Sequence, residues 1–261
     1  MDAGIAAKLA VLIDADNARP AIADSLLAEV ARYGTAHVKR VYGDWTGTAL
    51  KGWKEQLLRL SIQPVQQFAY TTGKNATDAA MLIDAMDLLY TGRFDGFCLV
   101  SSDSDFTRLA GRIRESGLTV YGFGERKTPK PFVAACDNFT YTENLAYPAE
   151  GPPPSRAVPR SAQAVPPRLV DTALVAALRY AVEAASAEDG WAHLGGVGAI
   201  LRKRQPDFDP RSHGYTKLME LVDATDVFDV QKRNPTDGNP AIIYVRERHA
   251  PEAATDARQV R

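Results

Sequence analysis

The chain has 261 residues, 45% of them hydrophobic and 24% charged, a composition that excludes a wholly disordered protein. Its 31 basic and 32 acidic side chains leave a net charge of −1, which excludes recruitment of nucleic acid by overall charge alone. Two distant cysteines and a short N-terminal apolar run provide no disulfide framework, zinc motif, signal peptide or membrane span. We therefore expect a cytoplasmic protein that makes no contact with membranes.

The first 147 residues alternate between strand-like and helix-like segments. Five short runs rich in β-branched and aromatic side chains predict strands at residues 9–13, 36–41, 62–68, 97–101 and 120–123. This alternation predicts right-handed crossovers and a parallel sheet with helices on both faces. Pro64 places its strand at an edge of the sheet, because proline lacks the N–H that a central strand donates.

Polar and acidic side chains gather where the first and fourth predicted strands end. The first strand is followed by Asp14 and Asn17. Asp103 and Asp105 follow the fourth strand, and Asp78 lies at the start of a helix. Ligands of open parallel sheets bind at the carboxyl ends of the strands, where converging carboxylates repel one another unless a cation lies between them. Their hard oxygens select Mg²⁺ or Mn²⁺, so the pattern predicts a divalent-metal site that activates water to hydrolyse a phosphodiester bond.

Two other hydrolytic mechanisms do not fit the sequence. The four histidines fall mostly outside the acid-bearing segments and form no Ser/His/Asp or Cys/His arrangement. The sequence also has no Walker-type GxxxxGK[ST] loop, which argues against hydrolysis of nucleoside triphosphates.

A proline-rich stretch follows the first part of the chain. Residues 148–167 hold seven of the 16 prolines and almost no bulky apolar side chain, which predicts an extended, semi-stiff linker. Residues 168–249 carry three helical apolar patterns, the first capped by Asp171, and then two β-prone runs around the turn-rich sequence NPTDGNP. Three helices followed by a hairpin predict a small winged-helix domain, and we expect residues 250–261 to form a flexible tail.

Four segments in a fixed order closely resemble the NYN domain, a branch of the PIN-like nucleases. They are IDADN at 13–17, VYGDW at 41–45, GKNATDAAMLIDAMDLL at 73–89 and SSDSDF at 101–106. The resemblance covers most of residues 8–145 and implies a PIN-like α/β parallel-sheet sandwich, a carboxylate pocket for Mg²⁺ or Mn²⁺, and endonucleolytic cleavage of RNA. Matched by position, Asp14, Asp78 and Asp103 would be the central catalytic acids and metal ligands. Asp105 and Asn17 would complete the catalytic pocket by ligation or by hydrogen bonds.

The second part of the chain resembles the LOTUS domain, also called OST-HTH. The resemblance lies in GWAHL, PDFDPRSHGYTKL and a terminal FDV, and it covers roughly residues 168–247. It implies a winged-helix module that binds RNA or a protein partner, and it adds no catalytic residue.

Each acid also has a structural interpretation. Asp78 could simply favour the first turn of its helix through the helix dipole, and Asp103 or Asp105 could cap the following helix. A purely structural role is harder to assign to Asp14, because an acid at the end of a strand buried on both faces needs a partner. Asp84 lies about 240° around the helix from Asp78, so we interpret it as a surface or packing residue.

Lys74 and Trp45 are the RNA-binding candidates of the first domain. Lys74 lies in a glycine-containing loop, where it either holds a phosphate or is an ordinary solvated lysine. Trp45 is interpreted as a rim residue that could stack on an unpaired base. Tyr42, Phe68 and Tyr70 also lie near strand ends, but core packing is the commoner fate of such aromatic side chains.

The second domain has one dense basic run, formed by Arg202, Lys203 and Arg204, and Lys217 lies near its third helix. These four side chains are its RNA-binding candidates. A run of charged residues usually forms a solvent-exposed face with no binding role. Residues 168–249 also hold one more acidic than basic side chain. The basic run can therefore be interpreted either as a phosphate-binding patch or as an ordinary solvent-exposed face.

These observations support two hypotheses. In the first, the protein is a metal-dependent endoribonuclease whose second domain recruits single-stranded or structured RNA, or a protein partner, while the linker raises the local substrate concentration. In the second, it is a non-catalytic RNA-binding adaptor or a subunit of an RNA-processing complex. Action on DNA or on a phosphorylated small molecule is a third alternative, because nothing in the sequence reads the 2′-hydroxyl group.

Overall fold

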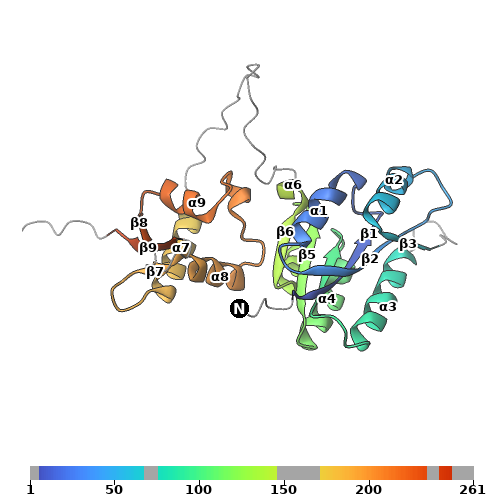
Figure 1. Cartoon of the computed structure of the whole chain (residues 1–261), viewed down its shortest axis with the longest axis horizontal. Coiled ribbons are helices and arrows are strands. Elements are labelled where there is room, and N and C mark those ends of the chain that lie inside the picture. Colours follow the sequence, from blue (N-terminus) through green and yellow to red (C-terminus); the bar gives the residue numbers. More distant parts are fainter. Residues whose placement is uncertain (1–5, 68–75, 146–170, 234–240, 249–261) are drawn as a thin grey trace, which may run out of the picture. The chain divides into compact units, whose positions relative to one another are not determined.

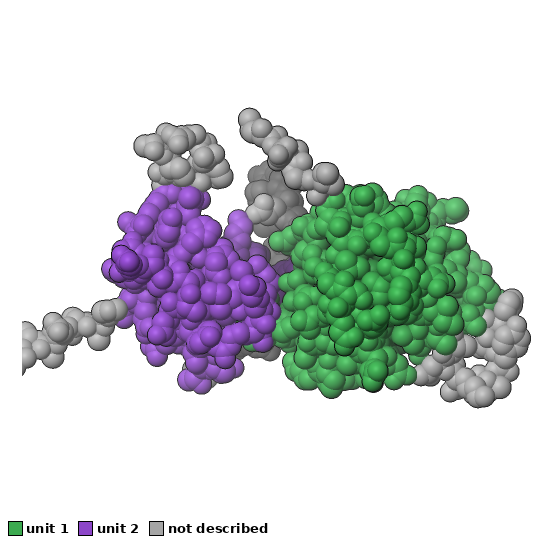
Figure 2. All heavy atoms as spheres, turned by 90° about the horizontal axis from the view of Figure 1, so that it is seen from below, with its two compact units in different colours: residues 1–158, 205–208 green, residues 159–204, 209–261 purple. Residues whose placement is uncertain are grey.

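The computed structural model describes residues 6–67, 76–145, 171–233 and 241–248. It forms two compact units, residues 1–158 with 205–208 and residues 159–204 with 209–261 (Figure 2). Several predictions concern segments that lie outside the described residues: the linker, the C-terminal tail, Lys74, Phe68, Tyr70 and the turn NPTDGNP.

The first unit is built on a six-stranded sheet in which every pair of neighbouring strands is parallel, in the order β3-β2-β1-β4-β5-β6 (Figure 1). Its strands are β1 (Lys8–Asp14), β2 (Thr35–Gly43), β3 (Gln63–Gln66), β4 (Gly96–Val100), β5 (Thr119–Gly124) and β6 (Asn138–Tyr141). The chain builds one half of the sheet outward from β1 and the other outward from β4, so the topological switch point lies between these two strands. The predicted parallel sheet is confirmed, and Pro64 lies in the edge strand β3.

Helices cover both faces of this sheet, as the alternation of elements predicted. They are η1 (Pro20–Ile22), α1 (Ala23–Val30), α2 (Lys51–Leu60), α3 (Ala76–Tyr90), η2 (Ser104–Phe106), α4 (Thr107–Glu115), α5 (Lys130–Ala135) and α6 (Thr142–Leu145). Helices α3, α4 and α5 contribute to one apolar cluster, and α1, α2 and α6 contribute to the other. Strand β1 supplies both clusters, since Ala10 and Leu12 point to one side and Leu9, Val11 and Ile13 to the other.

Strand β6 was missed by the sequence analysis. It has only four residues, of sequence NFTY, and two of them are polar, so its local pattern is weak. Its place at the sheet edge is decided by pairing with β5 and by burial of Phe139 and Tyr141 against the first apolar cluster.

The second unit has the predicted three helices and hairpin. Its elements are α7 (Thr172–Ala185), β7 (Ala192–His193), α8 (Leu194–Arg204), η3 (Pro210–His213), α9 (Leu218–Ala224), β8 (Phe228–Arg233) and β9 (Ile242–Glu247). Asp171 caps α7 as expected, because its carboxylate accepts a hydrogen bond from the Ala173 N–H at 3.1 Å. The two-residue strand β7 was not predicted, and it extends the hairpin to an antiparallel sheet in the order β7-β9-β8.

None of the helices in the described segments combines the length and the apolar character needed to cross a membrane.

Candidate metal centre

Four acidic residues lie at the carboxyl edge of the first unit's sheet, beside the switch point between β1 and β4. Asp14 is the last residue of β1, and Asp78 lies in the first turn of α3. Asp103 follows β4 and caps η2, which contains Asp105. Three separate chain segments therefore bring carboxylates to one edge, as the sequence predicted for parallel strands.

Three of these acids form a tight cluster. Asp78, Asp103 and Asp105 each offer a carboxylate oxygen, and these oxygens lie within 4.8 Å of one another. The side chain of Asp105 is exposed, whereas Asp78 is only 9% exposed. A cluster with one open side and three hard oxygen donors fits a divalent cation such as Mg²⁺ or Mn²⁺.

The pKa of Asp78 shows how strongly this cluster disfavours negative charge. Burial, followed by repulsion from Asp14, Asp103, Asp105 and Asp16, raises its pKa from the ordinary value of 3.8 to about 6. The charge of Asp14 therefore acts on the same site, although Asp14 is not one of the three acids in the tight cluster. A bound cation would remove the repulsion that these carboxylates now exert on one another.

Asp14 is fully buried and held in one orientation. Its Oδ1 accepts hydrogen bonds from the backbone N–H groups of Asp16 at 3.0 Å and Asn17 at 3.3 Å. Its Oδ2 accepts hydrogen bonds from Asn17 Nδ2 at 2.7 Å and Ser101 Oγ at 2.8 Å. Burial raises the pKa of Asp14, while the hydrogen bonds from Ser101 and Asn17 oppose that rise by stabilising the carboxylate.

Ser101 links the two central strands of the site, and the sequence analysis gave it no role. Its hydroxyl donates to Asp14 and also accepts a hydrogen bond from the Asp103 N–H at 3.1 Å. Asp103 in turn accepts from the Asp105 N–H at 2.9 Å. The cap that was considered as an alternative for Asp103 is therefore real, and the same residue also belongs to the acid cluster. The only local signal for Ser101 was its place in SSDSDF, directly after a strand.

The other candidates near the strand ends have structural contacts. Trp45 is half-buried, and its indole N–H donates to the Val65 carbonyl at 3.1 Å, so it covers the end of β3. Tyr42 is fully buried and donates its hydroxyl proton to Asp84, which also pairs with Arg40. Asp84 is thus a packing residue, as interpreted from its position on the helix.

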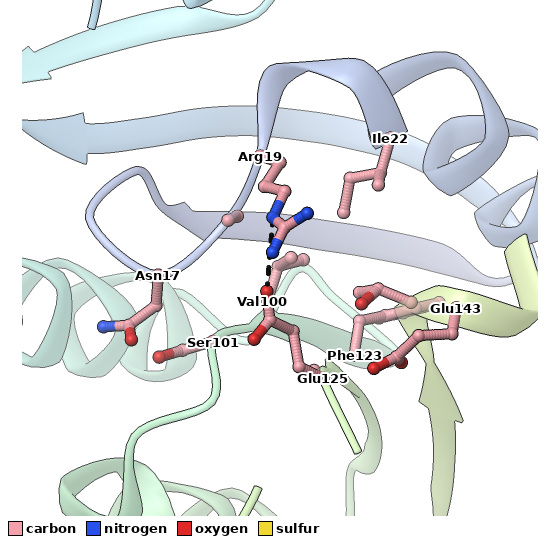
Figure 3. A pocket seen from close by; sticks show the side chains of 11 residues that line it. Asn17, Arg19, Ile22, Val100, Ser101, Phe123, Glu125 and Glu143 are labelled. Atoms are coloured by element: carbon pink, nitrogen blue, oxygen red, sulfur yellow. Dashed lines mark ion pairs between the residues drawn. The ribbon is translucent and has the colours of Figure 1, made fainter. Parts of the chain in front are cut away.

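A pocket of about 200 Å³ opens near the ends of β4 and β5, lined by Val100, Ser101 and Phe123 among others (Figure 3). Asn17 and Ser101, the two side chains that hold Asp14, form part of its wall. Apolar side chains, including Phe123, line another part, and an ion pair of 3.4 Å between Arg19 and Glu125 crosses the view in Figure 3. The pocket therefore has an apolar lining and a charged pair, and it reaches the buried acid only through Asn17 and Ser101.

The basic candidates of the second unit lie on two helices. Arg202, Lys203 and Arg204 are exposed in the last turn of α8, and the Arg204 guanidinium carbon lies 4.0 Å from the ring centroid of Tyr180. Lys217 is exposed at the N-cap of α9. The first three therefore share the last turn of α8, and Lys217 lies on a different element.

Comparison with family models identifies both units. The model of the NYN domain matches residues 8–144, which is more than half of the chain. The chain belongs to the NYN family. The model of the OST-HTH/LOTUS domain matches residues 166–240, so the NYN domain is followed by a LOTUS domain in the order expected from the sequence.

Several solved structures are similar to parts of this chain. A protein of unknown function from Vibrio parahaemolyticus is 19% identical over 54% of this chain and 96% of its own, with a TM-score of 0.46. An uncharacterized protein from Nitrosomonas europaea is 35% identical over 39% of this chain and 90% of its own, with a TM-score of 0.27. A protein from Chromobacterium violaceum is 30% identical over 36% of this chain and 99% of its own, with a TM-score of 0.26. No curated protein matches the chain.

NYN domains belong to the PIN-like nuclease superfamily, whose members generally use divalent metals. Together with the LOTUS domain, this membership supports a nuclease that binds RNA in general terms. The carboxylates at the edge of the sheet are the groups in this NYN domain that match such chemistry.

Proposed function

We propose that this protein is a metal-dependent endoribonuclease. The observation that supports the proposal is the cluster of Asp78, Asp103 and Asp105, whose carboxylate oxygens lie within 4.8 Å of one another beside the buried Asp14. In the proposed enzyme, these acids would hold an Mg²⁺ or Mn²⁺ ion, which would supply an acidified water and positive charge to neutralise a phosphoryl oxygen.

The residues of the chain have separate tasks in this proposal. Asp78, Asp103 and Asp105 hold the ion, and Asp14 is the fourth acid of the set. Asp14 already accepts four hydrogen bonds. To bind the ion directly, its carboxylate would have to give up one of these hydrogen bonds. Asn17 keeps the Asp14 carboxylate in place, as does Ser101.

The pocket lined by Asn17 and Ser101 could hold a small part of the proposed RNA substrate. At about 200 Å³ it is smaller than a site for a drug-sized ligand, so its size suits a single base or sugar. Arg19 lies at this pocket with a largely exposed side chain, where it can approach a flanking phosphate. Lys74 stays a proposed phosphate contact, and Trp45 stays a proposed stacking residue at the rim.

Cleavage of a labelled single-stranded RNA tests the proposal. The full chain is incubated with RNA and Mn²⁺, with RNA and EDTA, and with DNA of the same sequence. We expect internal cleavage of RNA with Mn²⁺ and none with EDTA. Asp78→Asn and Asp103→Asn should abolish it, whereas Asp87→Asn, the same chemical change at an exposed position of α3, should leave it intact.

The outcomes separate the alternatives. RNA binding with no cleavage under any metal would support the non-catalytic adaptor instead. Equal cleavage of DNA would show that the site does not select RNA. Full cleavage in EDTA, or by both cluster variants, would overturn the metal-dependent mechanism.

A further inference from the structure

One face of the LOTUS domain's sheet carries aromatic rings and guanidinium groups that neither the sequence analysis nor the proposed cleavage reaction uses. His193 of β7 lies opposite Tyr244 of β9, and Gln231 of β8 lies opposite Tyr244 on its other side. Because side chains alternate along a strand, Arg246 and Arg233 share this face with Tyr244. The turn before β7 adds Trp191 to the same face.

These side chains are in direct contact with one another. The guanidinium carbon of Arg233 lies 4.3 Å from the ring centroid of Tyr244 and 5.3 Å from that of Trp191. The guanidinium carbon of Arg246 lies 4.7 Å from the Trp191 centroid. The rings of His193 and Tyr244 meet edge to face at 5.8 Å. Arg246, Trp191, Arg233 and Tyr244 therefore form a row in which cations and rings alternate, and His193 lies edge-on at the Tyr244 end. We call these five side chains the stacking face.

The stacking face is accessible to a ligand. The side chains of Arg233 and Arg246 are 40% and 42% exposed, and His193 is also exposed. Trp191 and Tyr244 are half-buried, so each ring is supported by the fold and still reaches solvent. A ring that is fixed before binding loses little conformational freedom when a ligand stacks on it.

The charge of the stacking face argues against binding that depends on phosphates. Asp189 lies 3.7 Å from Arg233, and Asp229 lies 3.6 Å from Arg246 and 2.9 Å from Arg248, so both arginines of the face already have an acidic partner. Further acids, Glu183 among them, line a hollow next to Arg246 and would repel a phosphate backbone there. What the face offers in excess is flat π surface and guanidinium planes, which are the groups that stack on unpaired bases.

We propose that the stacking face binds the unpaired bases of single-stranded RNA, with Trp191 and Tyr244 as its main stacking residues and Arg233 between them. This inference takes RNA as the ligand from the proposed function but does not require cleavage. A duplex keeps its bases stacked on each other and presents its phosphates, so it should bind this face poorly. The basic run at the end of α8 lies on a different element and would add only phosphate contacts.

Binding of the full chain to a fluorescent single-stranded RNA of about 12 nucleotides tests the proposal, with EDTA present so that the RNA stays intact. We expect Trp191→Ala and Tyr244→Ala to weaken binding by about tenfold each, the usual cost of losing one stacked base. Arg233→Lys should also weaken binding, because an ammonium group keeps the charge but has no plane to stack. Lys232→Ala is the matched control, since it removes a positive charge from the neighbouring exposed position of β8 and should change affinity by no more than about twofold.

A second measurement does not depend on variants that could unfold. The chain has three tryptophans, and Trp53 is buried in the NYN domain. Stacking of a base on Trp191 should quench part of the tryptophan fluorescence when RNA is added. Trp191→Phe keeps an aromatic ring, so it should retain most of the affinity and lose that part of the quenching.

Three results would overturn the proposal: equal affinity for duplex RNA, no loss of affinity in Tyr244→Ala and Arg233→Lys while both stay folded, or no change in quenching between the wild type and Trp191→Phe. If RNA binding were unaffected and these variants instead lost a protein partner, the face would be a protein-binding surface. None of these results bears on cleavage, so failure of the stacking face and failure of the proposed nuclease are distinguishable.

Discussion

The acid cluster of the NYN domain and the stacking face of the LOTUS domain offer opposite chemistry to the RNA that we propose as their ligand. The cluster gathers negative groups, and burial together with repulsion raises the pKa of Asp78, so it needs a cation before it can receive a phosphate. In the stacking face both arginines have acidic partners, Asp189 and Asp229, and the rings of Trp191 and Tyr244 lie against the guanidinium groups. A net charge of −1 therefore says little about either region, because in our proposals one would bind through an ion and the other through flat rings.

The largest expected effect separates the two regions. Asp103→Asn should lower the cleavage rate by more than about 100-fold, because even an indirect partner of a metal ligand is worth about 10- to 100-fold. The same variant should bind single-stranded RNA in EDTA as tightly as the wild type, since the stacking face is untouched. Cleavage rates and anisotropy on one protein preparation measure both. A parallel loss of binding would mean that the acid cluster, and not the LOTUS domain, holds most of the RNA.

A smaller effect concerns how the cluster is positioned. Ser101→Ala removes the hydroxyl that donates to Asp14 and accepts from the Asp103 N–H, so the Mn²⁺ concentration needed for half-maximal cleavage should rise about tenfold. Loss of this donor also raises the pKa of Asp14. The acid limb of the pH–activity profile should therefore move to higher pH in the variant than in the wild type.

Ser102→Ala is the matched control for this change. Its hydroxyl is also buried but accepts from the Glu125 N–H, and among the described residues it makes no hydrogen bond to the four acids of the candidate site, so the metal dependence should stay unchanged. Equal effects of the two serine variants would show that general destabilisation of the loop, and not the position of Asp14, is responsible.

Thermal unfolding shows whether the cluster is destabilising without metal. The pKa of Asp78 is raised to about 6 in the folded chain, so its contribution to stability is fully present below its ordinary value of 3.8 and is lost as the pH rises through 6. At neutral pH in EDTA, Asp78→Asn should therefore raise Tm by a few degrees. Mn²⁺ should raise Tm of the wild type and not of the variant. A lower Tm for the variant in EDTA would contradict the proposed repulsion.

The smallest expected effect concerns Asp84, which lies on the same helix as Asp78. Tyr42→Phe removes the hydroxyl that donates to Asp84, a contact that has no part in the metal centre. We expect the free energy of unfolding to fall by about 1 kcal/mol, while the metal concentration for half-maximal cleavage stays the same. Urea denaturation and a metal titration measure the two quantities. A changed metal dependence would show that α3 transmits the loss from Asp84 to Asp78.

The sequence by itself determined the order of the elements and the edge at which the acids meet. Alternating apolar runs predicted parallel strands, Pro64 predicted an edge strand, and Asp14 and Asp103 each came directly after a run that had to be buried. These predictions succeed because parallel strands have their carboxyl ends on one side of the sheet, whatever the details of packing.

Only the tertiary structure decided which side chains touch. The pairing of Ser101 with Asp14 joins positions 87 residues apart, and the tight cluster contains Asp105 while Asp14 stands beside it. The stacking face depends on the register of β7, β8 and β9, which brings Trp191 and Arg233 together. Strand register and side-chain contact are set by long-range packing, so no local pattern in the chain reveals them.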